Sequence, residues 1–297
     1  MSFINPQNTQ TMIKPKITLL LAITLLVAVQ ARAQSPKEIL VFGQKINYIE
    51  AGSGPTVILL HGLGGSWQAW HFNIGPLAEK FHVIVPDQIG FGKSDKPLVN
   101  YRIRTYVDFL DQFCKQLKIE RATLIGNSMG GWIAAAFTAA FPDRVDKLVL
   151  VDAAGYAPPK DFDMRTLYRL NPTTREGMKS LAAKVFYNKA FLTDAAIEQA
   201  MAARLAAGDG YTIQSISESI IRGEDFLDDA VKTIKRPTLI VWGRQDGLVA
   251  LSEGERFNKD IAGSKLVVID QCGHVPNIEK PGEFNAAVIK FLTADAQ

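Results

Sequence analysis

Cysteine is almost absent from this chain, which has two cysteines among 297 residues. Neither lies in a CxxC motif or at the Cys/His spacing of a zinc site. The sequence therefore excludes a disulfide-rich scaffold. It also predicts no metal site.

An excess of one charge is also lacking. The chain has 33 Lys and Arg residues against 30 Asp and Glu, a net charge of +3, and 47% of its residues are hydrophobic. The whole surplus lies in residues 1–33, which contain Lys14, Lys16 and Arg32 and no acidic residue. This balance excludes a disordered chain and predicts no nucleic-acid partner.

No apolar run reaches the roughly 20 residues of a membrane span. A strongly apolar stretch of thirteen uncharged residues, Ile17 to Val29, follows two lysines. Ala31-Arg32-Ala33 then forms a small-x-small cleavage site. Residues 1–33 are predicted to be a signal peptide cleaved near Ala33, so we expect a periplasmic or secreted protein without a stable membrane anchor. An uncleaved signal-anchor helix is the alternative.

Beyond residue 33 the pattern predicts an α/β fold. Continuous β-branched and leucine runs, typical of strands buried on both faces, alternate with helical segments. Expected strands cover 38–43, 45–52, 56–62, 81–87, 122–128, 147–153, 237–243 and 265–271, and expected helices cover 68–79, 102–118, 130–140 and 282–293. The stretch 156–232 is helical and lacks such runs. We therefore predict an α/β core in two parts, 34–155 and 233–297, interrupted by a helical cap over 156–232.

A serine lies between a predicted strand and a predicted helix. Gly126-Asn127-Ser128-Met129-Gly130 fits the G-x-S-x-G pattern of a nucleophile on a sharp, strained turn. Ser128 is the predicted nucleophile. The Met129 amide begins the helix, where it can donate to a developing oxyanion.

A serine nucleophile needs a base, and only four histidines are present. His274 lies beyond the last predicted strand and after the serine in the chain, so it is the predicted base. His61 directly follows the third strand, in His-Gly-Leu-Gly-Gly, and we expect it to hold that loop.

The base in turn needs a carboxylate to orient it. Asp246 follows the strand before His274 and is predicted to do so, with Asp152, at the end of another strand, as the alternative. A second oxyanion donor is expected from the glycine-rich loop after His61, at the Leu63 amide.

These motifs together resemble the α/β-hydrolase superfamily over about residues 38–295. The motifs are HGLGG, PDQIGFGKSD, GNSMGG, WGRQDGLV and GHVPNIE. The resemblance implies a mostly parallel eight-stranded sheet with a helical cap inserted after the sixth strand, and no cofactor. It agrees with a triad of Ser128, Asp246 and His274.

Within the superfamily, GNSMGG is similar to the meta-cleavage-product hydrolases, which cut carbon–carbon bonds of dienoate acids. That resemblance implies a tryptophan after the catalytic histidine and a cap arginine for the substrate carboxylate. Here Val275 follows His274, and Arg204 is the nearby cap arginine. We therefore expect a serine carboxylesterase for small or medium uncharged esters, with a C–C hydrolase or a slow-turnover ligand receptor as alternatives. The sequence makes no prediction of oligomeric state.

Overall fold

The computed structural model describes residues 35–294. The predicted signal peptide, residues 1–33, lies outside this part of the chain, and so the structure does not test it. Within the described residues, no helix is long and apolar enough to cross a membrane.

An eight-stranded sheet forms the core, as predicted, with the strand order β1-β2-β4-β3-β5-β6-β7-β8. β2 pairs antiparallel with β1 and with β4, and the remaining pairs are parallel. The strands are β1 (Lys37–Val41), β2 (Gln44–Ala51), β3 (Thr56–Leu60), β4 (His82–Pro86), β5 (Ala122–Asn127), β6 (Val145–Val151), β7 (Thr238–Gly243) and β8 (Lys265–Ile269).

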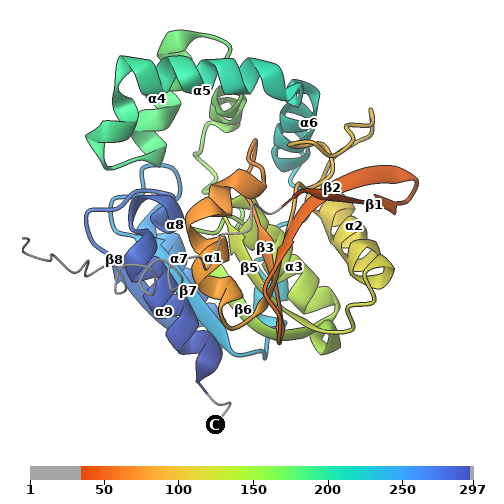
Figure 1. Ribbon diagram of the computed structural model, residues 1–297. Coiled ribbons are helices and arrows are strands. Elements are labelled where there is room, and N and C mark those ends of the chain that lie inside the picture. The colour runs from red at the N-terminus through yellow and green to blue at the C-terminus, as the bar shows by residue number, and fades with distance from the viewer. Residues whose placement is uncertain (1–34, 295–297) are drawn as a thin grey trace, which may run out of the picture. The chain divides into compact units, whose positions relative to one another are not determined.

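Helices cover both faces of this sheet (Figure 1). They are α1 (His71–Ala78), α2 (Ile103–Gln116), α3 (Met129–Ala140), α7 (Leu251–Asp260), α8 (Pro276–Glu279) and α9 (Pro281–Thr293). Two hydrophobic clusters show the layering: one contains buried residues of α2, α3 and α7, the other buried residues of α1 and α9. Successive residues of β3 belong to opposite clusters, as Ile58 and Leu59 do, because side chains of a strand point alternately to the two faces of the sheet. This explains why the parallel strands lack polar alternation.

Between β6 and β7 the chain leaves the sheet and forms a helical cap, which Figure 1 shows as the green and teal helices. The cap contains α4 (Arg175–Val185), α5 (Asp194–Ala207) and α6 (Gly210–Ile221), with the 3₁₀ helices Met164–Leu170, Lys189–Leu192 and Ala230–Thr233. Insertion of a cap after the sixth strand is thus confirmed. Its small interior consists of Met178, Ala182 and Ile197.

The end of α4 is hydrogen-bonded to two loops of the core. Lys184 O accepts from the Gly247 amide at 3.1 Å, in the loop after β7. Val185 O accepts from the His274 amide at 2.7 Å, in the loop after β8. One end of the cap is therefore fixed to the two loops that carry the predicted acid and base.

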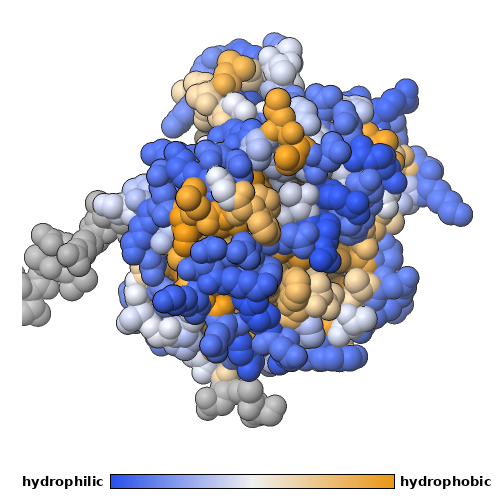
Figure 2. Space-filling model, turned by 90° about the vertical axis from the view of Figure 1, so that its right-hand side faces the viewer, coloured by the Kyte–Doolittle hydropathy of each residue, from blue (hydrophilic) through white to orange (hydrophobic). Residues whose placement is uncertain are grey.

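Hydrophobic side chains on the side of the molecule seen in Figure 2 gather in separate patches among hydrophilic ones. Exposed residues include Leu40 and Phe42 of the β1–β2 hairpin. Phe42 packs edge-on against Phe109 of α2, with the ring centroids 5.2 Å apart. The hairpin is thereby attached to α2.

Candidate active site

Ser128 lies at the turn between β5 and α3, where the sequence predicts a strained nucleophile. Its backbone has φ +55° and ψ −120°, a conformation that residues with a side chain rarely adopt. A side chain at Gly126 would overlap Gly130 O, and one at Gly130 would overlap Leu60 O. The turn therefore requires the two glycines of the motif, and the predicted strain is present.

His274 is joined to Asp246. Nδ1 of the imidazole lies 2.7 Å from Oδ2 of Asp246. Oδ1 of Asp246 accepts hydrogen bonds from the amides of Leu248 at 2.7 Å and Val249 at 3.0 Å. Both side chains are almost fully buried. The carboxylate is thus held in a fixed orientation and fixes the ring in turn.

The remaining ring nitrogen of His274, Nε2, is buried and has no hydrogen-bond partner in the described part of the chain. Among the described residues, no hydrogen bond joins it to Oγ of Ser128. A hydrogen bond of 3.0 Å from the Asn127 side chain to His274 O does tie the strand before the serine to the histidine loop. The structure therefore brings the acid and base together and holds the serine and histidine segments side by side.

Asp152, the alternative acid, lies beside this pair without bonding to the histidine. Its carboxylate, the carboxylate of Asp246 and the His274 ring offer atoms that all lie within 4.8 Å of one another. Oδ1 accepts from the Gly243 amide at 2.9 Å, and the buried Oδ2 has no partner. Burial and then the charge of Asp246 raise the pKa of Asp152 well above its ordinary value. The raised pKa favours the neutral form of the Asp152 carboxyl group beside Asp246.

The same three residues are the one group of acidic, histidine or cysteine side chains in residues 35–294 that is close enough to share a metal ion. The hydrogen bond between His274 and Asp246 already occupies Nδ1 of the ring. This arrangement fits an acid–histidine pair for proton transfer, and the sequence predicts no metal.

The two amides predicted to bind an oxyanion are free of hydrogen bonds within residues 35–294. The Leu63 amide lies in the loop after β3, and the Met129 amide begins α3. Gly62 brings the first loop against the nucleophile, because a Cβ on Gly62 would lie 3.1 Å from Cβ of Ser128. Unbonded amides beside a serine are what stabilisation of an oxyanion requires.

His61 holds the Leu63 loop, as expected. Nδ1 donates to Gly62 O at 2.8 Å, and Nε2 accepts from the Gln88 amide at 3.1 Å. The Gln88 side chain donates to His61 O at 2.7 Å. Burial lowers the pKa of His61, so the ring is neutral. With both ring nitrogens engaged, this histidine has no free site for proton transfer.

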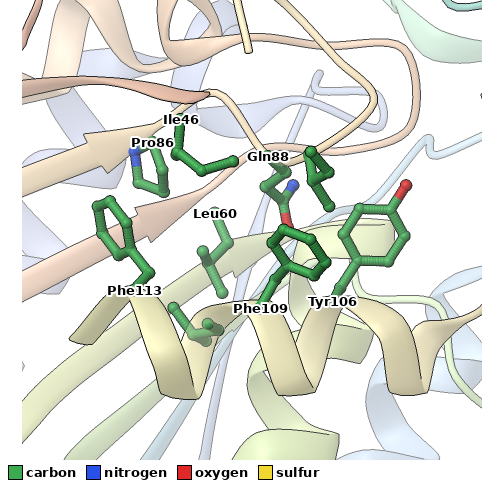
Figure 3. Close-up of a pocket in the computed structure, with 9 residues that line it drawn as sticks. Ile46, Leu60, Pro86, Gln88, Tyr106, Phe109 and Phe113 are labelled. Carbon is green, nitrogen blue, oxygen red and sulfur yellow. The ribbon is translucent and has the colours of Figure 1, made fainter. Parts of the chain in front are cut away.

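A small cavity of about 30 Å³ lies beside Gln88, between the sheet and α2 (Figure 3). Its walls are apolar apart from Gln88 and the Tyr106 hydroxyl, and include Leu60 and Phe109. Its volume suits about one water molecule. None of the predicted site residues lines it, so it is a packing gap and not a substrate site.

The cysteines are both buried and unpaired. Burial raises the pKa of Cys114 to about 12, and burial also raises the pKa of Cys272. Cys272 lies two residues before His274 in the chain, yet it is a protonated thiol and does not compete with Ser128 as a nucleophile.

Sequence reasoning missed the contact that the cap makes above the Leu63 loop. Arg204, at the end of α5, lies against Gly64, since a Cβ on that glycine would be 2.7 Å from Nη1 of the guanidinium. Arg204 forms an ion pair with Asp209, which is 1% exposed. The sequence identified Arg204 as a nearby cap arginine but gave no sign of its partner.

Comparison with known proteins agrees with this geometry. The alpha/beta hydrolase fold family matches residues 55–281. The 2-hydroxy-6-oxononadienedioate/2-hydroxy-6-oxononatrienedioate hydrolase of Escherichia coli O139:H28 is 35% identical over 263 residues, which cover 84% of this chain and 91% of that protein.

Two solved structures are similar as well. A meta-cleavage product hydrolase from Pseudomonas fluorescens IP01 has 32% identity and a TM-score of 0.79, covering 86% of this chain and 97% of its own. A membrane phospholipase A, described as a bacterial virulence factor, has 31% identity and a TM-score of 0.76, covering 87% of this chain and 86% of its own. With the family match spanning most of the chain, this protein belongs to the α/β-hydrolase superfamily.

Proposed function

We propose that the protein is a serine hydrolase that cleaves carboxylic esters through an acyl-enzyme. The observation that carries this proposal is the buried His274–Asp246 pair, whose free Nε2 belongs to the loop tied to the strained Ser128 segment. Ser128, His274 and Asp246 act as nucleophile, base and orienting acid.

In the first half of the reaction, His274 Nε2 takes the Ser128 proton as Oγ attacks the ester carbonyl. The Leu63 and Met129 amides donate to the resulting oxyanion. His274 then returns the proton to the departing alcohol oxygen, and the acyl group remains on Ser128. In the second half, water loses a proton to His274 and attacks the acyl-enzyme, which releases the acid and restores Ser128.

Small or medium uncharged esters are the proposed substrates. The C–C hydrolases remain the second candidate, because the Escherichia coli relative bears a dienedioate hydrolase name and is 35% identical. This chain departs from their pattern at Val275, which follows His274 and is buried. The similar phospholipase A, at 31% sequence identity, supports ester hydrolysis from a relative of comparable sequence similarity. A slow-turnover ligand receptor with an intact triad is the non-enzymatic alternative.

A p-nitrophenyl ester series from acetate to decanoate, hydrolysed by the wild type and by Ser128→Ala, tests the proposal. We expect rapid wild-type turnover, a fall of several orders of magnitude in the variant, and a chain-length optimum that sizes the pocket. Faster turnover of a 2-hydroxy-6-oxo-dienoate than of every ester would favour the C–C hydrolase. Equal, slow rates for wild type and variant would reject catalysis by Ser128 and favour the receptor.

We also propose that residues 156–232 form the cap between core segments 34–155 and 233–297.

We further propose that residues 1–33 are a cleaved signal peptide and that the mature protein is periplasmic or secreted. The support for export is the basic, apolar and small-x-small order of the leader. Mass spectrometry of the protein from fractionated bacterial cells should find a chain that begins near Gln34 outside the cytoplasm. A full-length chain in the membrane fraction would favour the signal anchor.

A further inference from the structure

An ion pair of the cap, Arg204 with Asp209, is buried against the loop after β3 that carries the Leu63 amide. The side chain of Arg204 is 11% exposed and that of Asp209 is 1% exposed. The two residues are close in sequence: α5 ends at Ala207, and the φ of +64° at the following Gly208 turns the chain so that Asp209 returns to the arginine. The pair therefore belongs to one tight cap corner.

Within residues 35–294, the carboxylate of Asp209 has no partner besides Arg204. Neither of its carboxylate oxygens accepts a hydrogen bond from the described residues, and its ion pair with Arg204 is the only one those residues give it. A buried carboxylate is costly unless a charge compensates it. Burial lowers the pKa of Arg204, but a guanidinium stays charged in proteins, so Asp209 has a full positive charge beside it.

The guanidinium of Arg204 is directed at the loop that carries the Leu63 amide and is largely shielded from solvent. Its Nη1 lies against Gly64, one residue beyond the Leu63 amide, and a Cβ on that glycine would also lie 3.4 Å from Cδ1 of Ile213 in α6. Gly64 has no side chain to separate the guanidinium from the loop. An unpaired arginine here would attract a carboxylate on the substrate, whereas the pair with Asp209 presents no net charge.

We propose that Asp209 is a specificity-determining residue that neutralises Arg204, so that the site takes uncharged esters and rejects esters that carry a carboxylate. This inference rests on the proposed ester hydrolysis and deepens it. It predicts that removal of the Asp209 charge alone changes the charge preference of the enzyme and leaves the chemistry of the triad in place.

Matched esters test the proposal. p-Nitrophenyl hexanoate and mono-p-nitrophenyl adipate have acyl chains of equal length that end in a methyl group or a carboxylate. 4-Butyryloxybenzoate and its methyl ester place the same difference on the alcohol side. The quantity measured is the ratio of kcat/KM for the anionic ester to that for the neutral ester, with Ser128→Ala as the blank for spontaneous hydrolysis.

The wild type should strongly prefer the neutral ester of each pair. Asp209→Asn should raise the anionic-to-neutral ratio by about tenfold or more for at least one pair, since it exposes the Arg204 charge to the substrate. The double variant Arg204→Met/Asp209→Asn should return the ratio to near the wild-type value. Asp225→Asn is the matched control, because it breaks an ion pair with Arg102 elsewhere in the molecule and should leave the ratio unchanged.

Each result bears on a stated claim. A wild type that prefers the anionic ester overturns the inference without any variant, so the test stands even where Asp209→Asn fails to fold. An unchanged ratio in folded Asp209→Asn, confirmed by thermal melting, also overturns it. If the wild type hydrolyses neither ester in a Ser128-dependent way, the proposed function itself is wrong, which the blank reveals separately.

Discussion

Two buried histidines follow strands of the same sheet, yet their loops leave them in opposite states. In the loop after β3, both ring nitrogens of His61 are engaged, by Gly62 O and by the Gln88 amide. In the loop after β8, His274 is held at Nδ1 by Asp246, and its buried Nε2 has no partner. Burial is similar in the two cases, so it does not separate a structural histidine from a reactive one. The difference between them is that His274 has a ring nitrogen without a hydrogen bond among the described residues, whereas His61 has no such nitrogen.

The largest expected difference between the two loops comes from removal of the free nitrogen. His274→Ala should lower kcat/KM on a p-nitrophenyl ester by about 10⁴-fold or more, because it removes the base of the proposed triad. Steady-state rates measured beside the melting temperature provide the check. A loss of less than about tenfold in a folded variant would mean that another group accepts the serine proton.

The second prediction separates the two acids beside His274. Asp246→Asn should lower kcat by about 10³- to 10⁴-fold, since an amide would hold the ring in the wrong tautomer, as it does in serine proteases. Asp152→Asn is the matched control and should change kcat less than about fivefold, because the raised pKa of Asp152 favours its neutral form and its carboxylate does not bond to His274. Kinetics of the two variants under the same conditions provide the test. A larger loss of kcat in Asp152→Asn than in Asp246→Asn would make Asp152 the orienting acid.

The loop after β3 should respond differently to the same kind of change. His61→Ala removes two hydrogen bonds and leaves the buried Gln88 amide unsatisfied, while Gly62 O keeps the Gly65 amide, so it should lower the free energy of unfolding by about 2–4 kcal/mol. The Leu63 amide would lose its support, and we expect kcat to fall by roughly 10- to 100-fold. Urea unfolding and ester kinetics measure the two effects. Large activity loss with unchanged stability would assign His61 to the chemistry instead.

The smallest effect is a pH dependence of stability. The lowered pKa of His61 means that the unfolded chain binds a proton more readily than the folded one. The contribution of the neutral ring is therefore complete above about pH 6.5 and is lost as the pH falls below that value, by at most about 1.4 kcal/mol per pH unit. Urea unfolding of wild type and His61→Asn between pH 7.5 and 5 isolates this contribution, which should be absent from the variant. Parallel curves for the two proteins would contradict it.

Much of this molecule could be predicted from local patterns. Strands such as β5 and β6 are buried on both faces and therefore show continuous apolar runs, and the glycines around Ser128 indicate the strained turn that the structure contains. Order in the chain and position at strand ends sufficed to find Asp246 and His274 because parallel strands bring their carboxyl ends to one edge.

The features that escaped prediction have weaker local signals. α7 was not expected, since only Gly254 and Phe257 of its ten residues are buried. Their i, i+3 spacing was the available sign. The partner of Arg204 depends on a left-handed turn at Gly208, and the bonds from α4 to the core use backbone oxygens, which have no signature in the side-chain sequence.

Those backbone bonds have a consequence for chimeric enzymes. Lys184 and Val185 belong to the cap by topology, yet their carbonyls hold the amides of Gly247 and His274. A graft that exchanges the whole insertion for that of a relative would replace the supports of the acid and base along with the substrate pocket. A donor segment that begins after residue 188 would keep these supports in the host, so α5 and α6 can be exchanged together if the donor has an apolar residue at position 197 to pack on Met178 and Ala182 of α4.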